Sequence, residues 1–328
     1  MNSYPSSPST TSAALIFENV DKRYGGVVAL EQLSLTVPEG GCFGLLGPNG
    51  AGKSTAVSIA ATLRAADSGS VRVFGDDVRR ARSAVRRQIG IVFQENCLDR
   101  ELTAREHLQF HARLYRLDHR DQIVPRALDA AGLSAAADRP VRGFSGGMAR
   151  RLEIARGMLP RPRLLFLDEP TLGLDVAARR GVWEQLRSLT EERTTLFLTT
   201  HAMEEADTLC DRLAILDGGR IVASGTPEEL KADVGADLVR IRLRRNGGAE
   251  ETLRGFPGVR GIDLEGPETA EGSTLRIFVE NGPERLAALL DALRPFSVLE
   301  VHLERPTLES VFLHHTGHTF AAAESEQP

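Results

Sequence analysis

Lysine is scarce in this chain of 328 residues, although lysine and arginine together number 40. The only lysines are Lys22, Lys53 and Lys231. A basic residue placed by chance would almost always be arginine here, so a lysine inside a glycine-rich segment is informative. The chain also lacks a basic excess. Its net charge of −5 argues against a nucleic-acid partner, because binding to phosphates favours a basic surface.

Cysteine and long apolar runs are also lacking. Cys42, Cys97 and Cys210 are too few and too scattered for a disulfide framework or a metal cluster. No apolar run approaches the roughly 20 residues that span a bilayer. Residues 1–13 lack the basic start and apolar centre of a signal peptide, and we expect a disordered tail there. These absences favour a cytoplasmic protein of two globular domains.

The chain is organised around a glycine-rich segment that lies between an apolar strand, predicted at 42–46, and a helix, predicted at 55–63. The segment matches the phosphate-binding pattern G-x-x-x-x-G-K-[ST] in the context that the pattern requires. We expect its backbone N–H groups to surround a phosphate, its lysine to neutralise the β- and γ-phosphates, and its serine hydroxyl to bind Mg²⁺. The segment consists of Gly47, Pro48, Asn49, Gly50, Ala51, Gly52, Lys53, Ser54 and Thr55.

Polar residues follow three other apolar runs that read as strands. The run 164–168 ends in Asp168 and is followed by Glu169. In this order behind a phosphate loop, the first carboxylate is expected to hold Mg²⁺ and the second to polarise a water molecule. Gln94 and His201 follow strands at 89–93 and 194–199. Alone, each reads as an ordinary strand-end residue, but Gln94 could ligate Mg²⁺ and His201 could bond a γ-phosphate.

A third motif precedes the helix predicted at 148–158. Ser145 is followed by Gly146 and Gly147. Ser145 is a good helix N-cap, while the two glycines would expose backbone N–H groups to an anion. Spacing alone does not decide between a cap and a binding site.

The remaining pattern predicts an α/β fold followed by a smaller α+β domain that is ferredoxin-like by its count of elements. We expect a nucleotide-binding domain at 14–235 with a helical part at about 95–160, an accessory domain at 236–317, and a disordered tail at 318–328. Within these, the sequence predicts antiparallel strands at 15–24 and 27–37, a strand at 71–74, a helix that begins at Pro125, a helix at 176–191, a hairpin at 212–223, a helix from Pro227, further strands at 238–243, 259–264, 275–279 and 298–303, and helices at 283–293 and 306–314.

Together these motifs closely resemble the ATP-binding cassette (ABC) ATPase family over about residues 15–232. Residues 47–55 match its Walker A loop, 164–168 with Glu169 its Walker B strand and catalytic glutamate, and Gln94 its Q-loop. Residues 144–148 are similar to the signature motif, 173–175 to the D-loop, and His201 to the switch histidine.

The resemblance implies roles that spacing does not supply. ATP and Mg²⁺ would be the ligands, with Tyr24 stacking on adenine. Two chains would pair head to tail, so that Ser145, Gly146 and Gly147 of one bind the γ-phosphate held by Lys53 of the other. Glu169 would be the general base, with Gln94 and His201 at the γ-phosphate and the water, and Asp175 would communicate across the homodimer.

The sequence departs from the family pattern at several positions. Phe144 and Met148 replace the commoner leucine and glutamine, and Ala149 and Leu172 stand where polar residues are usual. Met148 with residues 150–153 resembles the bacterial drug exporters of the daunorubicin-resistance type, and the segment 305–313 is similar to their ending. This subclass implies a separate integral membrane permease, contacted near Gln94 and residues 95–103, and a chain that is peripheral on the inner face of the membrane.

Other functions are weighed against this hypothesis. An ABC ATPase acting on nucleic acid, ribosomes or cofactor assembly is disfavoured by the single cassette, the negative charge and the absence of long coiled-coil heptads. A GTPase would need an Asn-Lys-x-Asp guanine reader, and no lysine here follows an asparagine. A structural module with an inactive ATP site is disfavoured because Lys53, Asp168, Glu169 and His201 are all present. The accessory domain could stabilise a dimer, regulate the ATPase or contact the permease.

Overall fold

The structure is a computed structural model that describes residues 12–235, 237–244, 248–269, 272–316 and 320. Its internal contacts divide the chain into two units: the first runs to Pro227 and also includes Phe320, and the second begins at Glu228 and ends before Phe320. The predicted tails fall almost entirely on residues outside this description, although Ala13 already begins the first strand. In the part of the chain that is described, no helix is both long and apolar enough to cross a bilayer.

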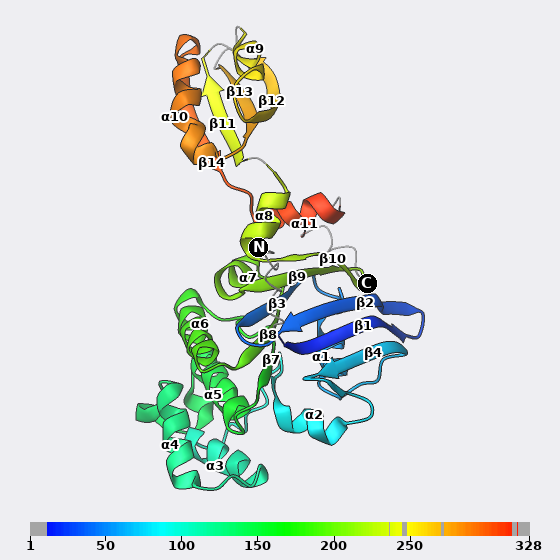
Figure 1. The fold of residues 1–328 in the computed structure, drawn as a ribbon. Helices are drawn as coiled ribbons and strands as arrows, with labels where there is room; N and C mark the ends of the chain where they lie inside the picture. Colours follow the sequence, from blue (N-terminus) through cyan, green and yellow to red (C-terminus); the bar gives the residue numbers. More distant parts are fainter. Residues whose placement is uncertain (1–11, 236, 245–247, 270–271, 317–319, 321–328) are drawn as a thin grey trace, which may run out of the picture. The chain divides into compact units, whose positions relative to one another are not determined.

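A six-stranded sheet forms the centre of the first unit, with the strand order β10-β9-β3-β8-β7-β6 (Figure 1). All of its neighbouring pairs are parallel except the hairpin β9-β10, which confirms the hairpin predicted at 212–223. Every residue of β3, β7 and β8 is buried, as expected for strands covered on both faces. The strands are β3 (Cys42–Leu46), β6 (Ile89–Val92), β7 (Leu164–Asp168), β8 (Thr195–Thr200), β9 (Arg212–Asp217) and β10 (Arg220–Gly225).

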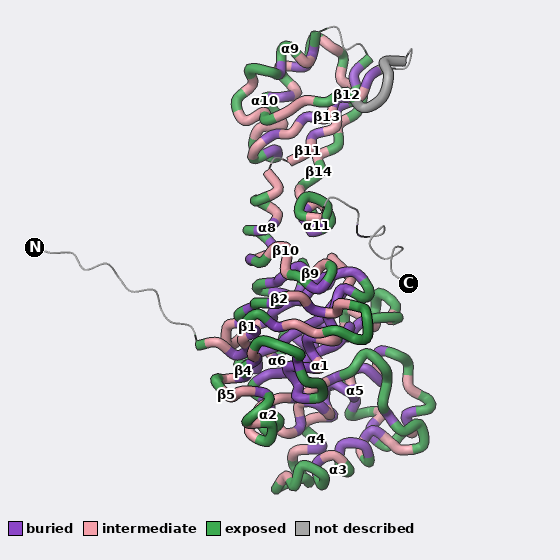
Figure 2. The backbone as a smooth tube through the Cα atoms, turned by 90° about the vertical axis from the view of Figure 1, so that its right-hand side faces the viewer, coloured by how far each residue is buried: buried purple, intermediate pink, exposed green. Residues whose placement is uncertain are grey.

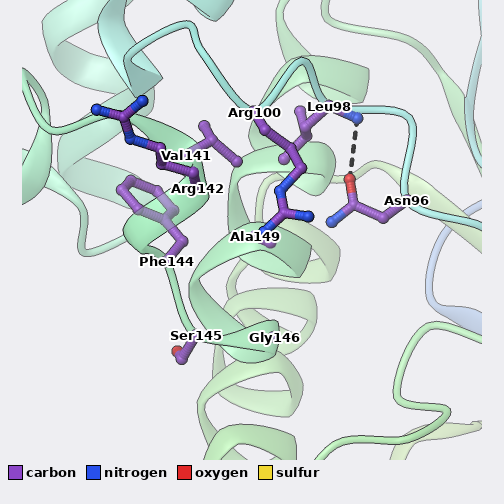
Figure 3. Close-up of a pocket in the computed structure, with 9 residues that line it drawn as sticks. All are labelled: Asn96, Leu98, Arg100, Val141, Arg142, Phe144, Ser145, Gly146 and Ala149. Atoms are coloured by element: carbon purple, nitrogen blue, oxygen red, sulfur yellow. Dashed lines mark hydrogen bonds between the residues drawn. The ribbon is translucent and has the colours of Figure 1, made fainter.

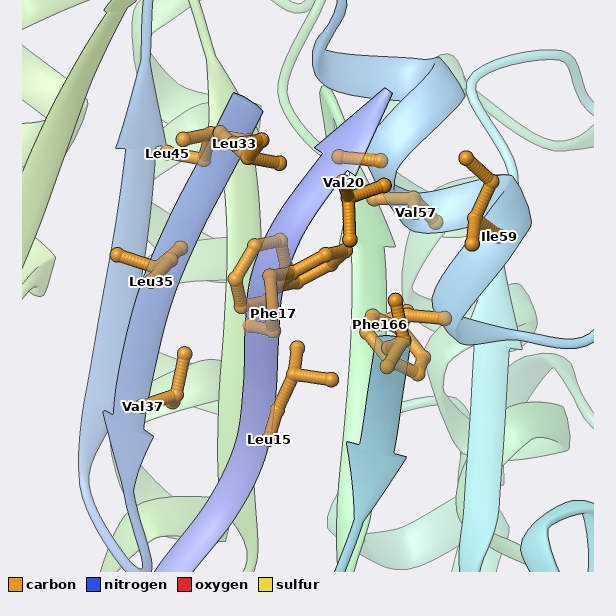
Figure 4. Close-up of a cluster of buried hydrophobic side chains, with 14 of the residues drawn as sticks. Leu15, Phe17, Val20, Leu33, Leu35, Val37, Leu45, Val57, Ile59 and Phe166 are labelled. Carbon is orange, nitrogen blue, oxygen red and sulfur yellow. The ribbon is translucent and has the colours of Figure 1, made fainter. Parts of the chain in front are cut away.

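A second, antiparallel sheet has the order β2-β1-β4-β5 and confirms the pairing predicted for the first two strands. Its strands are β1 (Ala13–Tyr24), β2 (Val27–Pro38), β4 (Ser68–Val73) and β5 (Asp76–Asp77). Helix α1 (Lys53–Ala60) contacts both sheets. Side chains from β1, β2, α1 and the central strands share one apolar cluster, which includes Phe17, Leu33, Ile59 and Phe166 (Figure 4). This cluster fixes the start of α1, and with it the glycine-rich loop, relative to the sheet.

The first unit contains further helices: α2 (Arg82–Gln88), α3 (Ala104–Leu114), α4 (Arg120–Ala130), α5 (Gly146–Met158), α6 (Val176–Glu191) and α7 (Met203–Leu209), with the short turns η1 (Ser134–Ala136) and η2 (Val141–Gly143). Helices α3, α4 and α5 share an apolar core of their own. The prediction that a helix begins at Pro125 is wrong. The chain enters α4 at His119, in a left-handed conformation, and Pro125 lies exposed inside the helix.

The second unit confirms the ferredoxin-like prediction. Its sheet has the order β12-β13-β11-β14 with every neighbouring pair antiparallel, which is the topology of a β-α-β-β-α-β unit. It has its own apolar cluster, built on β11, β13, α9 and α10 (buried residues are purple in Figure 2). The elements are α8 (Pro227–Asp233), β11 (Asp237–Leu243), α9 (Ala249–Arg254), β12 (Val259–Thr269), β13 (Gly272–Val279), α10 (Gly282–Ala292), η3 (Arg294–Phe296), β14 (Val298–Glu304) and α11 (Leu308–Thr316).

Candidate active site

Four neighbouring parallel strands, β3, β8, β7 and β6, bring the motif residues to one edge of the sheet. Leu46 is paired with Thr200, and Asp168 with Thr199, so these strands end at nearly the same level. The carboxyl ends of parallel strands are where ligands bind in open α/β sheets. The glycine-rich loop follows β3, His201 follows β8, Glu169 follows β7, and Gln94 comes two residues after β6.

The glycine-rich loop has positions that no other residue fits. Gly52 has a φ of 108°, and a Cβ there would lie 2.3 Å from the carbonyl oxygen of Ala29. A Cβ on Gly47 would lie 2.3 Å from the carbonyl oxygen of Leu216. Both distances are far shorter than any real contact, so the loop can pack against these strands only with glycine at both positions.

Lys53 begins α1 and its side chain is only 4% exposed. Its Nζ donates to the carbonyl oxygens of Gly47, at 2.8 Å, and Pro48, at 3.0 Å. The same atom lies 3.3 Å from Oε1 of Glu169. A buried cation is stable only when it is paired and hydrogen-bonded, and these partners hold the ammonium group at the base of the loop.

Ser54, Asp168 and Thr199 form a cluster of oxygen atoms beside Lys53. The Ser54 hydroxyl donates to Oδ1 of Asp168 at 3.2 Å, and the Thr199 hydroxyl donates to the same oxygen. Among the described residues, no group of three or more His, Cys, Asp or Glu side chains could hold a metal by itself. A hydroxyl and a carboxylate fit Mg²⁺, which prefers hard oxygen ligands and usually takes the rest from phosphates and water.

Glu169 is the point at which Lys53, Gln94 and His201 meet. Its carboxylate is 3.3 Å from Lys53 Nζ, and its Oε2 accepts a hydrogen bond of 3.4 Å from Gln94 Nε2. The Nδ1 atom of His201 lies 3.2 Å from the same Oε2, although without the angles of a hydrogen bond. The side chain of Glu169 is 7% exposed, so a lysine, a glutamine and a histidine surround one buried carboxylate.

The backbone of Glu169 is strained. Its φ is 46°, in the left-handed region that residues other than glycine rarely adopt. Such a conformation costs about 1–3 kcal/mol and persists only where the surroundings fix it. The N–H of Glu169 donates to the carbonyl oxygen of Thr199 at 3.1 Å and to its hydroxyl at 3.2 Å. Thr199 therefore positions both acidic residues of the motif.

A cavity of about 200 Å³ opens beside these groups. The predicted residues that line it are Asn49, Gly50, Gly52, Lys53, Ser54, Thr55, Gln94 and Glu169, with Ala29 from β2. The structure does not bring every predicted residue here. Tyr24 is 38% exposed at the end of β1, where Lys22 Nζ and Arg64 Cζ each lie 5.3 Å from the centre of its ring. It is not among the residues that line this cavity.

The signature segment lines a different cavity, of about 330 Å³, at the start of α5 (Figure 3). Ser145 caps α5 by accepting a hydrogen bond of 3.3 Å from the N–H of Met148. Ser145 and Gly146 face this cavity together with Arg100, Arg142 and other residues. Asp175 likewise caps α6, accepting from the N–H of Ala178 at 2.8 Å. The structure therefore shows that Ser145 is a helix cap. Ser145 and Gly146 do not line the cavity beside Lys53.

Two contributors to the site escape sequence reasoning. Thr199 looks like any β-branched residue of a buried strand, and nothing in the local pattern marks its hydroxyl. Arg150 looks like one of several arginines on α5, yet it is buried and donates to the carbonyl oxygens of Asp168 and Glu169. A charged residue at a position that the helical pattern assigns to the core is the signal that could have identified it.

Comparison with known proteins accounts for both units of the chain. The ABC transporter family model matches residues 30–172. The model described as the C-terminal domain of DrrA1-3-like ATP-binding proteins matches residues 225–316. Among solved structures, one titled as the ATP-binding subunit of an ABC transporter matches with a TM-score of 0.61 and 29% identity, over 68% of this chain and 93% of that chain.

Curated relatives match over nearly the whole length. The daunorubicin resistance ATP-binding protein DrrA3 of Streptomyces coeruleorubidus is 42% identical over 93% of this chain and 96% of its own length. The Nod factor export ATP-binding protein I of Sinorhizobium fredii is 41% identical over 95% of this chain and 88% of its own length. The chain therefore belongs to the ABC transporter family, as an ATP-binding, ATP-hydrolysing subunit with a C-terminal domain of the DrrA type.

Proposed function

We propose that the chain powers a bacterial ABC exporter whose transmembrane pathway is a separate permease. The observation that carries this function is that Lys53, Gln94 and His201 surround the carboxylate of Glu169 at one edge of the sheet. The oxygen cluster of Ser54, Asp168 and Thr199 lies beside Lys53 at the same edge. Relatives across both units are named for daunorubicin resistance and Nod factor export, which supports a drug, antibiotic or lipid-like cargo.

ATP would bind with its phosphates in the glycine-rich loop. The N–H groups at the start of α1 and the Lys53 ammonium would neutralise the β- and γ-phosphates. Ser54, Asp168 and Gln94 would hold Mg²⁺, which neutralises charge on the phosphate oxygens. Tyr24 would support the adenine from the end of β1. The buried carboxylate of Glu169 would act as the base for the attacking water, with His201 and Gln94 orienting the water and the γ-phosphate.

Two copies would complete each other's sites. In one copy Ser145, Gly146 and Gly147 form the start of a helix of 13 residues, and Ser145 and Gly146 line a cavity other than the one beside Lys53. A helix N-terminus with glycine N–H groups is suited to a phosphate. We infer that it meets the γ-phosphate bound by a second copy in a head-to-tail homodimer, and that Asp175 relays the state of one site to the other.

The permease would dock on the groove drawn in Figure 3. One wall is formed by Asn96, Leu98 and Arg100, within the segment that follows Gln94. The other is formed by Val141, Arg142 and Phe144, which lead into Ser145. A permease element seated between these walls would contact the segment that follows Gln94 and the residues that lead into Ser145, while Ser145 and Gly146, at the start of α5, would face the second copy. The chain would therefore be a cytoplasmic subunit held at the inner face of the membrane by its permease, with no nucleic-acid partner.

Trapping the dimer tests this function. In Glu169→Gln the amide still fills the pocket but cannot accept the proton of water, so we expect ATP to bind, turnover to fall at least about 100-fold and a dimer to accumulate. ATPase rate and size-exclusion chromatography with MgATP would measure both. Glu184→Gln, on α6, is the matched control. Normal turnover in Glu169→Gln would exclude Glu169 as the base, and co-purification of ribosomes or DNA in place of a membrane permease would refute the exporter.

A further inference from the structure

Arg150 carries a charge in the interior of the first unit. It lies on α5, five residues after Ser145, and its side chain is 7% exposed. A buried guanidinium needs a partner for each of its donors, because leaving a buried charged group without partners is strongly unfavourable.

The partners of Arg150 lie at the ends of two neighbouring strands, β7 and β6. Its Nε donates to the carbonyl oxygen of Pro170 at 2.7 Å. Its Nη2 donates to the carbonyl oxygens of Asp168, at 2.9 Å, and Glu169, at 3.2 Å. Its Nη1 donates to the carbonyl oxygen of Phe93. The planar guanidinium therefore joins the turn at 168–170 to the residue that precedes Gln94.

A second charged residue extends this connection. Glu153, one turn further along α5, is 2% exposed and lies 3.1 Å from Nη1 of Arg150. Its other oxygen accepts a hydrogen bond of 2.9 Å from the N–H of Cys97. Arg150 and Glu153 thus hold the segment 93–97, which carries Gln94, at both of its ends.

The strained backbone of Glu169 gives these contacts a consequence for catalysis. A φ of 46° is held only if the neighbouring peptide groups are held, and Arg150 bonds the carbonyls of residues 168, 169 and 170 while Thr199 bonds the N–H. Small changes in that backbone would move the carboxylate away from Lys53, Gln94 and His201. Geometry of this kind must be held to within a fraction of an ångström for efficient reaction.

We propose that Arg150 is a positioning residue for ATP hydrolysis. From its place on α5, it fixes the turn at 168–170 and the segment 93–97 relative to each other. Arg150 does not line the cavity beside Lys53, so its effect acts through other residues. The proposal rests on the assignment of Glu169 as the base. It predicts that loss of the Arg150 guanidinium slows the chemical step of ATP hydrolysis and leaves the affinity for ATP nearly unchanged.

Two substitutions at one position test this role. Arg150→Gln removes the charge and most donors, and Arg150→Lys keeps the charge on a single nitrogen. We expect single-turnover hydrolysis to fall about 10- to 100-fold in Arg150→Gln and less in Arg150→Lys, while the Kd for a fluorescent ATP analogue stays within about threefold. Arg151→Gln is the control, because Arg151 donates to Ala131 within the helical part. Wild-type hydrolysis in a folded Arg150→Gln protein, or a parallel loss of affinity, would overturn the proposal.

A double variant separates positioning from general structural support. If Arg150 acts through Glu169, Arg150→Gln should add almost nothing to the defect of Glu169→Gln, because the two residues act as a unit. If the two substitutions reduce the rate of hydrolysis additively, Arg150 does not act through Glu169. Normal turnover in Glu169→Gln would instead mean that the proposed base is wrong. If melting curves show that Arg150→Gln does not fold, Arg150→Lys decides between the outcomes in the same assays.

Discussion

Lys53 and Glu169 are each other's charge partner in a nearly dry environment, with side chains 4% and 7% exposed. Removing one member of such a pair leaves the other charge buried without compensation, which typically costs about 3–5 kcal/mol. The pair also places the ammonium group where phosphates would enter. Lys53 therefore contributes to the stability of the glycine-rich loop and, in the proposed function, to the binding of nucleotide.

Lys53→Ala should weaken ATP binding by at least about tenfold, because the β- and γ-phosphates would lose the positively charged ammonium group that neutralises them. Calorimetric titration with MgATP would measure the affinity, and Lys231→Ala, in the second unit, is the control. Unchanged affinity in a folded Lys53→Ala protein would refute the assignment of the phosphate loop.

His111 on α3 makes stability depend on pH. Burial, with added repulsion from Arg156 and His107, lowers the pKa of His111 from 6.5 to about 4. Between these values the unfolded chain binds a proton at this position that the folded chain does not, so stability falls as the pH drops from 6.5 towards 4.

His111→Gln should therefore resist acid better than the wild type. Each unit of pKa corresponds to about 1.4 kcal/mol, and because His111 is partly exposed we expect a relative gain on the order of 1–2 kcal/mol at pH 4.5. Urea denaturation at pH 7.5 and 4.5 would measure it. Above pH 7 the free energy of unfolding should depend on pH in the same way in both proteins. If both lose the same amount of stability at acid pH, His111 is not the source of the pH dependence.

At the level of elements, the sequence predicts best where the pattern is long and regular. Continuous apolar runs identify β3, β7 and β8, and a strand-loop-helix order locates the glycine-rich loop. The helices α2, α7 and α9 are not anticipated, because 6 or 7 residues give too little periodicity to stand out. The sequence does place Glu169, Gln94 and His201 at strand ends. Their meeting around one carboxylate depends on strand order, and the strained φ and the contacts of Arg150 depend on packing between distant segments.

Helix α4 contains a proline, Pro125, at an interior position that disfavours the helix. The first N–H groups of a helix have no intrahelical partner, but Pro125 is the sixth residue, beyond that region, and it cannot donate to the carbonyl four residues earlier. Proline in a helix interior is about 3 kcal/mol less favourable than alanine. A substitution by alanine would recover only part of this free energy, because it also raises the conformational entropy of the unfolded chain.

Pro125→Ala should stabilise the protein by about 1–2 kcal/mol, since Pro125 is exposed and its replacement removes little buried surface. Urea denaturation followed by circular dichroism would measure the gain. Pro140→Ala serves as the control, because Pro140 precedes η2 with a φ of −60°, which proline favours. A destabilised Pro125→Ala protein would mean that the proline is needed for packing in the helical part.

At the level of the whole molecule, the proposed homodimer divides each ATP site between two chains. A Ser145→Arg chain keeps an intact Lys53, and a Lys53→Ala chain keeps an intact Ser145. In a mixed dimer, one of the two composite sites contains both native residues and the other contains neither. Random pairing makes about half of the dimers mixed, so the mixture should recover up to about a quarter of wild-type ATPase activity.

Each variant alone should be nearly inactive, and activity should rise only after the two proteins are mixed and allowed to exchange. Mixing wild type with Ser145→Arg provides the reference for exchange itself. If the mixture never exceeds the more active of its two components, the sites are not shared in the head-to-tail manner.

The position of Lys53 as the first residue of α1 also has a spectroscopic use. Because Lys22, Lys53 and Lys231 are the only lysines, incorporation of ¹⁵N-lysine would give a backbone amide spectrum with one resonance for each of them. The Lys53 resonance would report from the phosphate loop, Lys22 from the neighbourhood of Tyr24, and Lys231 from α8 in the second unit. Three single-residue substitutions would assign the whole spectrum. Occupancy of the nucleotide site and the response of α8 could then be followed in one titration of a 35.6 kDa chain, without a full resonance assignment.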